Sequence, residues 1–370
     1  MRLISKIVFT CSILLSCCQQ TTFAQDNERD WLMTEIEKII RFDTEISFKT
    51  VPGFIIGVID EDSTYIFPFG HKMPSKKSGS IGENDIFEIG SISKLYTTSI
   101  IRMLVQEKKL SYSQHINEFL PEEYQNPRLN HINIHSLIHH QSGLPLRPYM
   151  FGAKEQDSQN PYLYYTRTDL LEFFRDYIPE KEGFVYSHTN YALLELIIEK
   201  VTGQNFDDVF QRYLKQPLQL KNTFIDFPEQ KENYISPGYD KAVNLTKPWL
   251  YSSFRASEGV KTSITDALKY LNFILRDDQV NMIRDSVVMD EEFPLENSFN
   301  QHLTIENGWH ILQVKNHKIA IHTGRTSGHS CFMGMVKSSK TAVVIFSNSW
   351  VGTGDLGLQI LRMINQNWKM

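Results

Sequence analysis

The chain has 370 residues, of which 41% are hydrophobic and 22% are charged, so it is long enough to bury a large core. Its formal net charge is -5 and it carries no basic stripe, which argues against a nucleic-acid partner. This composition, without low-complexity tracts, also excludes a mainly disordered chain.

Residues 1–24 are predicted to be a signal peptide, because a basic start precedes an apolar run over 7–15 that is too short to span a bilayer. Two processing sites are alternatives. The small residue before Gln25 is typical of plain cleavage, whereas the segment ending at Cys17 resembles a lipoprotein box. We therefore expect a periplasmic or secreted protein, or a lipoprotein anchored to the membrane at a lipidated Cys17.

Residues 25–370 are expected to form a single domain. Apolar residues recur at helical spacing from Glu28 to Phe48, which predicts a first amphipathic helix. Phe54–Ile59 and Thr64–Phe69 are rich in β-branched and aromatic residues and flank a polar turn, so they are predicted to be paired strands.

The middle of the domain, about 101–250, is predicted to be a mainly helical lobe. Helical periodicity is found in three segments, which are Ser91–Lys109, Asp169–Phe174 and Tyr191–Val201. A further helix is expected after Ser263, whose hydroxyl can cap it, with Asp266 at the third helical position.

The last quarter of the chain is predicted to return to strands and to end in a helix from Leu356 to Asn367. The predicted strands are Trp309–Val314, Lys318–His322, Ser330–Val336 and Thr341–Phe346. This order predicts an α+β fold, in which an antiparallel sheet is built from both chain ends and flanked by helices, with the helical lobe inserted.

The segment from Glu88 to Leu95 contains the first chemical signal, an S-x-x-K spacing of Ser91 and Lys94. If Ser91 opens a helix, Lys94 lies one turn further on the same face. A lysine whose pKa is lowered by burial can take the proton of a serine hydroxyl, and the helix N-terminus offers N–H groups to an oxyanion. This spacing is weak evidence when it stands alone.

Two later segments strengthen it. Tyr186 lies in a loop before a helix, where a phenol could take part in proton transfer. The predicted strand ending in His322-Thr323-Gly324 could donate a backbone N–H to an oxyanion, and Gly324 would allow a substrate to approach closely.

These segments resemble the serine β-lactamase and penicillin-binding-protein superfamily, and in particular its class C β-lactamase, D,D-peptidase and esterase branch. The resemblance follows the chain in order through Ser91–Lys94, Ile134–Pro145 with His140, Tyr186–His188, Leu196–Gly203, Pro217–Leu220, Asn307–Trp309 and His322–Gly324. Each motif is loose by itself, but the ordered set is specific.

The resemblance implies a β-lactamase/transpeptidase-like fold and an acyl-enzyme formed on Ser91, with no cofactor and no metal. Lys94 and Tyr186 would share proton transfer. His322 would orient the substrate or Tyr186, beside Thr323 and Gly324 in the substrate site, and the N–H groups of Ser91 and Arg325 would form an oxyanion hole. The expected partner is a small-molecule or peptide substrate. No oligomeric state is predicted.

Two residues depart from the family pattern. His188 stands where the family has the asparagine of Y-x-N, and it is larger and titratable. Arg325 follows Gly324 where small residues are usual, so it would narrow the cleft or bind a carboxylate. Both are predicted to contact the substrate. The change to histidine at position 188 argues against β-lactam hydrolysis more strongly than it argues against a serine nucleophile.

Other interpretations stay open at this point. D-amino-acid peptides, small esters, β-lactams and amides are all candidate substrates. The rival function is a protein that binds penicillin or cell-wall peptide without turning it over.

Histidines at 131, 135 and 139 have helical spacing, but no carboxylate or cysteine cluster supports a metal site. Cys331 lies in an apolar run and is expected to be a buried, inert thiol.

Overall fold

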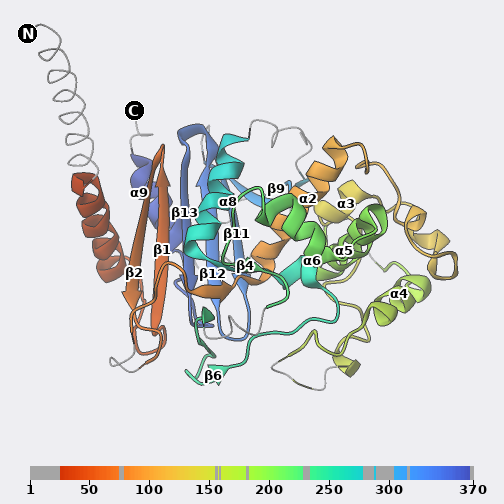
Figure 1. The fold of residues 1–370 in the computed structure, drawn as a ribbon, viewed down its shortest axis with the longest axis horizontal. Coiled ribbons are helices and arrows are strands. Elements are labelled where there is room, and N and C mark those ends of the chain that lie inside the picture. Colours follow the sequence, from red (N-terminus) through yellow and green to blue (C-terminus); the bar gives the residue numbers. More distant parts are fainter. Residues whose placement is uncertain are drawn as a thin grey trace, which may run out of the picture.

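The computed structural model describes residues 26–74, 79–154, 157, 160–180, 183–227, 234–277, 287–288, 304–314 and 317–366 (Figure 1). The predicted signal peptide, residues 1–24, lies outside these ranges. Among the described residues, no helix is both long enough and apolar enough to cross a membrane.

An antiparallel sheet forms the centre of the molecule. In the described part of the chain its strands follow the order β2-β1-β13-β12-β11-β10-β9-β8. Their bounds are β1 (Gly53–Asp60), β2 (Ser63–Gly70), β8 (Val287–Val288), β9 (Thr304–Glu306), β10 (Trp309–Val314), β11 (His317–Arg325), β12 (Ser330–Val336) and β13 (Thr341–Ser347). Phe54 of β1 pairs with Ser347 of β13, so the sheet is built from both chain ends, as predicted.

Helices cover both faces of this sheet (Figure 1). A helix over residues 26–42 and α9 (Leu356–Ile364) pack on one face, against Phe54, Ile56 and Val58 of β1. The alternate residues of β1 face α8 (Ile264–Arg276) on the opposite side. A strand with both faces buried is apolar throughout, which explains the continuous hydrophobic sequence of β1.

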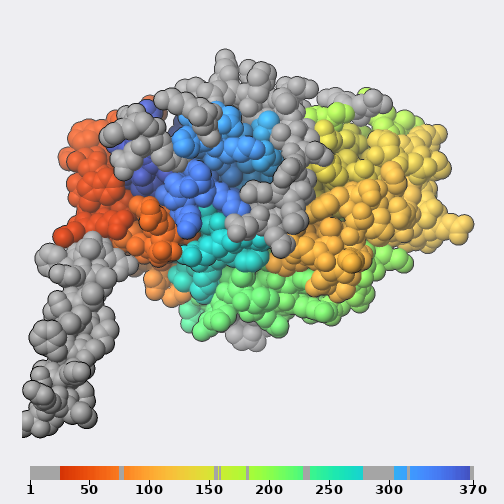
Figure 2. Space-filling model, turned by 90° about the horizontal axis from the view of Figure 1, so that it is seen from above, coloured from red at the N-terminus to blue at the C-terminus, as the bar shows by residue number. Residues whose placement is uncertain are grey.

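The rest of the helices form the inserted lobe, which lies at the end of the molecule opposite the N-terminal helix (Figure 2). They are η1 (Gly90–Ile92), α2 (Ser93–Gln106), η2 (Ile116–Glu118), η3 (Glu122–Tyr124), η4 (Pro127–Leu129), α3 (Ile134–Ile138), η5 (Gly152–Lys154), α4 (Arg167–Asp176), α5 (His188–Thr202), α6 (Phe206–Phe210), η6 (Gln211–Lys215) and α7 (Arg255–Glu258). Smaller elements are β3 (Ile86–Glu88), β4 (Thr223–Phe224), β5 (Gly238–Tyr239), β6 (Leu245–Thr246), β7 (Lys261–Ser263) and η9 (Lys337–Ser339).

Several predicted boundaries are confirmed. The β1–β2 pair and the last four strands lie where the alternating patterns placed them, and α9 begins at Leu356. Ser263 caps α8, because its hydroxyl accepts a 3.3 Å hydrogen bond from the Asp266 amide.

Several predicted boundaries were wrong, among them the ends of α2, at Gln106 rather than Lys109, and of α9, at Ile364 rather than Asn367. The first helix ends at 42 rather than at Phe48, and a turn follows in which the Ser47 carbonyl accepts hydrogen bonds from the amides of Thr50 and Val51. The helix predicted from Ser91 is divided into the 3-10 turn η1 and α2. The helix predicted from Tyr191 begins earlier, at His188, because Ser187 caps it by accepting a hydrogen bond from the Asn190 amide.

Candidate active site

Ser91 lies in η1, directly after the short strand β3. Gly90 has a φ of +51°, a left-handed conformation that favours glycine, and a Cβ on it would lie 2.7 Å from the backbone nitrogen of Arg325. The chain therefore turns sharply against strand β11, and α2 begins two residues after Ser91 with Lys94 in its first turn. Lys94 Nζ donates a 3.0 Å hydrogen bond to Ser91 Oγ.

The ammonium of Lys94 is surrounded by acceptors. Besides Ser91 Oγ, it contacts the Ser257 carbonyl at 3.2 Å and His188 Nδ1 at 3.0 Å, and the Glu258 carboxylate lies 3.7 Å away. The side chain is fully buried, and burial lowers the pKa of Lys94 to about 8, although Glu258 opposes the shift. A lysine of this kind changes its charge close to neutral pH.

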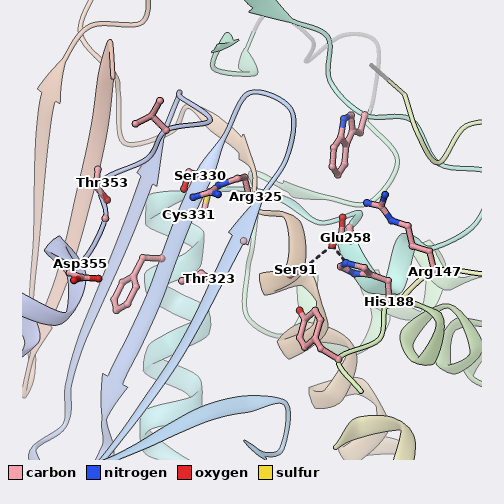
Figure 3. Close-up of a pocket in the computed structure, with 16 residues that line it drawn as sticks. Ser91, Arg147, His188, Glu258, Thr323, Arg325, Ser330, Cys331, Thr353 and Asp355 are labelled. Atoms are coloured by element: carbon pink, nitrogen blue, oxygen red, sulfur yellow. Dashed lines mark hydrogen bonds and ion pairs between the residues drawn. The ribbon is translucent and has the colours of Figure 1, made fainter. Parts of the chain in front are cut away.

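Glu258 is the second partner of Ser91. Ser91 Oγ donates a 2.7 Å hydrogen bond to Glu258 Oε1 (Figure 3). The other carboxylate oxygen, Oε2, accepts a 2.9 Å hydrogen bond from the Tyr162 hydroxyl. Tyr162 accepts in turn from Arg147 at 3.0 Å. Burial alone raises the pKa of Glu258, but His188, Lys94 and Ser91 together hold it below its usual value, so this buried carboxyl is ionised.

His188 is the first residue of α5, and it points into the same cluster. Its Nδ1 lies 2.9 Å from Glu258 Oε1 and 3.1 Å from Ser257 Oγ, in addition to the contact with Lys94. Burial lowers the pKa of His188 to about 4, so the imidazole is neutral at pH 7. A single ring nitrogen cannot be donor and acceptor at once, so the protonation of this histidine is coupled to that of the lysine and the glutamate.

Tyr186 lies beside Ser91 and Lys94. Burial raises the pKa of Tyr186, a hydrogen bond with Ser91 opposes the shift, and Lys94 Nζ lies 5.3 Å from the ring centroid. His140 holds the loop on both sides of this tyrosine: its carbonyl accepts from the Val185 amide at 2.8 Å and its Nδ1 accepts from the Ser187 amide at 3.0 Å. The phenol is thus neutral, and the chain on both sides of it is held in place.

Strand β11 closes the site from the other side. A Cβ on Gly324 would lie 1.9 Å from the Ile89 carbonyl oxygen and 3.1 Å from the Ser91 nitrogen, so only glycine fits this contact. Together with the approach of Gly90 to the Arg325 nitrogen, this shows that the backbone around Ser91 packs closely against the backbone at Gly324 and Arg325. The Arg325 side chain is exposed and lies over the Trp350 ring, 4.3 Å from its centroid.

His322 belongs to the same strand, but it does not line the pocket that contains Ser91. It is buried, its Nδ1 donates to the Thr323 carbonyl at 2.7 Å, and its ring stacks on His310 with the centroids 4.7 Å apart. Burial lowers the pKa of His322 well below its usual value, with His310 and Lys94 adding to the effect. The predicted role of His322 in orienting the substrate or Tyr186 stays a prediction.

These elements surround one pocket of about 410 Å³, shown in Figure 3. Its lining residues are Ser91, Arg147, Tyr186, His188, Trp249, Glu258, Thr323, Gly324, Arg325, Ser330, Cys331, Phe332, Val351, Thr353, Gly354 and Asp355. Of the predicted site residues, all but Lys94 and His322 line it, and Lys94 lies behind Ser91 at hydrogen-bonding distance.

The competing candidates have other surroundings. Ser93 Oγ is buried and accepts a 3.0 Å hydrogen bond from the Val260 amide. Cys331 lines the pocket, but burial raises the pKa of its thiol, which favours the less nucleophilic form. Within the described ranges, no group of three or more His, Cys, Asp or Glu residues could hold a metal ion.

The pocket residues that the sequence analysis missed include Glu258, Arg147 and Trp249. Glu258 lies 167 residues beyond Ser91, in a segment without a motif, and only the packing of α7 against α2 and η1 brings it to the site. The one local signal is an acidic residue inside the otherwise uncharged run Ala256–Val260, just before β7.

Comparison with known proteins places this geometry in a family. The beta-lactamase family model matches residues 43–365. A beta-lactamase of Providencia stuartii is 22% identical over 336 residues, which cover 81% of this chain and 83% of that protein. A penicillin-binding protein of Bacillus subtilis (strain 168) is 25% identical over 80% of this chain and 68% of its own length. An unguisins hydrolase of Aspergillus violaceofuscus is 25% identical over 47% of this chain and 32% of its own length.

Solved structures agree on the fold. A class C beta-lactamase superposes with a TM-score of 0.77 at 17% identity, covering 93% of this chain and 98% of that one. A beta-lactamase/D-alanine carboxypeptidase from Pseudomonas syringae gives a TM-score of 0.75 at 17% identity, covering 93% and 100%. The family match spans most of the chain and the superpositions reproduce its architecture, so the chain belongs to the beta-lactamase family.

Proposed function

We propose that this protein is an exported serine hydrolase that forms an acyl-enzyme on Ser91 and cleaves an ester, an amide or a D-amino-acid peptide bond. The observation that carries the proposal is the 3.0 Å hydrogen bond from buried Lys94 to Ser91 Oγ, at the mouth of a pocket lined by Tyr186 and strand β11. A serine needs a proton acceptor and an oxyanion site to attack a carbonyl, and the surroundings of Ser91 offer both.

In the proposed reaction, Ser91 Oγ attacks the carbonyl carbon while its proton is lost to the surrounding cluster. The negative charge on the carbonyl oxygen is stabilised by the amides of Ser91 and Arg325, which belong to two closely packed backbone segments. Tyr186, a neutral phenol beside Ser91 and Lys94, supplies a proton to the leaving group. Water then attacks the acyl-enzyme and releases the acid, with Thr323 and His188 contacting the substrate.

The relatives support a hydrolase with a small-molecule substrate, because they include beta-lactamases, a penicillin-binding protein and an unguisins hydrolase. His188 replaces the asparagine of the family motif and contacts Lys94 directly. For this reason we place esters, amides and D-amino-acid peptides before β-lactams.

Export is part of the proposal and rests on the sequence of residues 1–24 alone. Mass spectrometry of the mature protein from its native membrane and periplasmic fractions should find either Gln25 or a lipidated Cys17 at the N-terminus. An intact Met1 start in the cytoplasm would contradict it.

A fluorophosphonate probe and a panel of chromogenic substrates test the enzymatic proposal. The probe should add one label, which peptide mapping should place on Ser91, and Ser91→Ala should lose both label and turnover while its circular dichroism spectrum stays unchanged. A label on Ser91 without turnover of any ester, amide or peptide would instead support the rival function, a penicillin or cell-wall-peptide binder. Full activity of Ser91→Ala would remove the mechanism.

A further inference from the structure

In its ammonium form, Lys94 has no electron pair with which to accept a proton. Lys94 Nζ donates to two acceptors within 3.2 Å, Ser91 Oγ and Ser257 O, and it lies 3.0 Å from His188 Nδ1, whose role depends on the tautomer of the ring. The hydrogen bond between Lys94 and Ser91 therefore runs from the lysine to the serine. In this state Lys94 cannot accept the serine proton.

The Ser91 proton points instead at a carboxylate. Ser91 Oγ donates a 2.7 Å hydrogen bond to Glu258 Oε1. This contact is shorter than the 3.0 Å hydrogen bond that Ser91 Oγ accepts from Lys94 Nζ. The carboxylate is 3% exposed, and its second oxygen is held by Tyr162 at 2.9 Å. A buried, oriented carboxylate in direct contact with a nucleophilic hydroxyl has the geometry of a general base.

We propose that Glu258 is a catalytic residue, the immediate acceptor of the Ser91 proton, and that Lys94 acts as an ammonium that stabilises the resulting alkoxide. This inference rests on the proposed function, because it assumes that Ser91 is the nucleophile. The lysine and the glutamate exchange the roles that the S-x-x-K spacing alone would give them.

The proton balance closes within the site. In acylation, the Oγ–H bond breaks and its proton moves to Glu258 Oε1, the Oγ–C bond forms, and the carbonyl electron pair moves to the oxygen between the two amides. As the tetrahedral intermediate collapses, the bond to the leaving group breaks and the proton on Glu258 returns to that group directly or through Tyr186. In deacylation, a water molecule gives its proton to Glu258, its oxygen bonds to the carbonyl carbon, and Ser91 Oγ recovers the proton as it leaves.

The charge state of the cluster matches this assignment, with Lys94 as an ammonium and Glu258 as a carboxylate. Since the pKa of Lys94 is about 8, the ammonium prevails at pH 7, whereas the pKa of Glu258 is held below its usual value. The titratable groups that face Glu258 are Lys94, His188, Tyr162, Tyr186, Tyr251 and, through Tyr162, Arg147. Of these groups, Lys94, with a pKa of about 8, changes its charge between pH 6 and 9, whereas His188, with a pKa of about 4, does not.

Hydrolysis of p-nitrophenyl acetate tests the base directly, because its leaving group needs no proton. Glu258→Gln keeps the shape and an acceptor oxygen but removes the base, so acylation should slow by about 100-fold or more. Glu195→Gln is the matched control. Glu195 is also buried and contacts the Ala256 amide at 3.0 Å, but it does not touch Ser91, so this variant is expected to keep most of the activity.

Chemical rescue separates a base from a structural carboxylate. Formate added to Glu258→Ala should restore part of the acylation rate, and formate added to Lys94→Ala should not. Glu258→Gln with a near wild-type rate would overturn the proposal. Absence of formate rescue, combined with an equal loss in Glu195→Gln, would overturn it as well, because the carboxylates would then act only through folding.

The pH profile of the wild-type enzyme provides a test that requires no variant to fold. With Glu258 as base and the ammonium required, kcat/KM should be level from pH 6 to 7 and should fall as the pH rises through 8. A neutral Lys94 acting alone as base would make kcat/KM rise through the same range, and that result would overturn the proposal. Whichever pH profile is found, a fluorophosphonate label on Ser91 would still support the serine mechanism. Failure of the Glu258 proposal can therefore be distinguished from failure of the proposed function.

Discussion

His188 Nδ1 lies 2.9 Å from Glu258 Oε1, so the histidine that departs from the family motif contacts the acidic residue that the motifs do not include. Both side chains also contact Lys94, at 3.0 Å and 3.7 Å. An asparagine at position 188 could not titrate, whereas a histidine can be a donor or an acceptor beside the carboxylate. The two residues therefore form one electrostatic unit with the lysine.

Lys94→Ala should lose most of its turnover while Ser91 is still present. The variant removes the 3.0 Å donor to Ser91 Oγ and leaves Glu258 without its neighbouring ammonium. A loss of about 10²–10³-fold in kcat/KM for a neutral ester is expected for the removal of a donor that stabilises a developing negative charge. Steady-state kinetics checks the prediction, and urea unfolding of the same preparation establishes that the loss is not one of folding. Retention of more than a tenth of the wild-type kcat/KM would contradict it.

How much the sequence predicted depends on how far apart the interacting residues are in the chain. The paired strands β1 and β2 and the Ser91–Lys94 spacing are local patterns, so periodicity and helical geometry were enough to place them. The contact between Ser91 and Glu258 is different, because it depends on α7 packing beside α2 and η1. No local pattern carries that information.

The contacts of His140 were also not predicted, because they join segments that are far apart in the chain. The motif that contains His140 was recognised, but its carbonyl and ring bind the amides on both sides of Tyr186, which is 46 residues further along the chain. Helix ends were also missed where a side chain decides them, as with the Ser187 cap that starts α5 at His188. Propensity places a helix, while capping and turn hydrogen bonds fix its ends.

His188→Asn should retain esterase activity and gain β-lactam acylation. Asparagine can accept a hydrogen bond from Lys94 in place of Nδ1, and it restores the family's Y-x-N motif. The check is to compare p-nitrophenyl acetate hydrolysis with the formation of a penicilloyl adduct, followed by intact-mass spectrometry. Loss of turnover on every substrate would mean that His188 itself relays protons, and that Tyr186, Lys94 and Glu258 are not sufficient.

Arg325→Ala should weaken anionic substrates more than neutral ones, because an oxyanion site needs only the backbone N–H of this residue. The guanidinium is exposed, so the lower end of the range for a charge-assisted hydrogen bond applies, about 1.5 kcal/mol or roughly tenfold in kcat/KM. Paired neutral and carboxylate-bearing esters measure the ratio. Lys241→Ala is the control, since Lys241 also lies over the Trp350 ring but does not line the pocket. Equal losses on both substrates would refute carboxylate binding.

Gly324→Ala should damage both stability and activity. The added Cβ would lie 1.9 Å from the Ile89 carbonyl oxygen, a backbone atom that cannot move without shifting η1 and Ser91. Overpacking of this kind costs about 1–3 kcal/mol in the free energy of unfolding. Urea titration should detect that loss, and Gly152→Ala serves as control because a Cβ there has no atom within 4 Å. Equal stability of the two variants would show that the contact between Gly324 and the Ile89 carbonyl leaves room for a Cβ.

The buried histidines should make the protein lose stability on acidification. Burial lowers the pKa of His188 to about 4 and that of His310 to about 3, and it lowers the pKa values of His140 and His322 well below the usual value. The unfolded chain binds protons to these rings near pH 6.5, whereas the folded protein does not. Their contribution is therefore fully present above pH 6.5, and it is lost as the pH falls toward 4 and 3, by about 1.4 kcal/mol per pH unit for each ring.

Urea unfolding at pH 7, 6, 5 and 4.5 measures this slope. His310→Phe keeps an aromatic ring but removes one titrating group, so its free energy of unfolding should fall less steeply with decreasing pH than that of the wild type, by about 1.4 kcal/mol per unit. His131→Gln is the matched control, because His131 is exposed, and its slope should equal that of the wild type. The same slope in His310→Phe and the wild type would mean that His310 is protonated in the folded protein, and the neutral histidine stack beside Tyr186 would have to be abandoned.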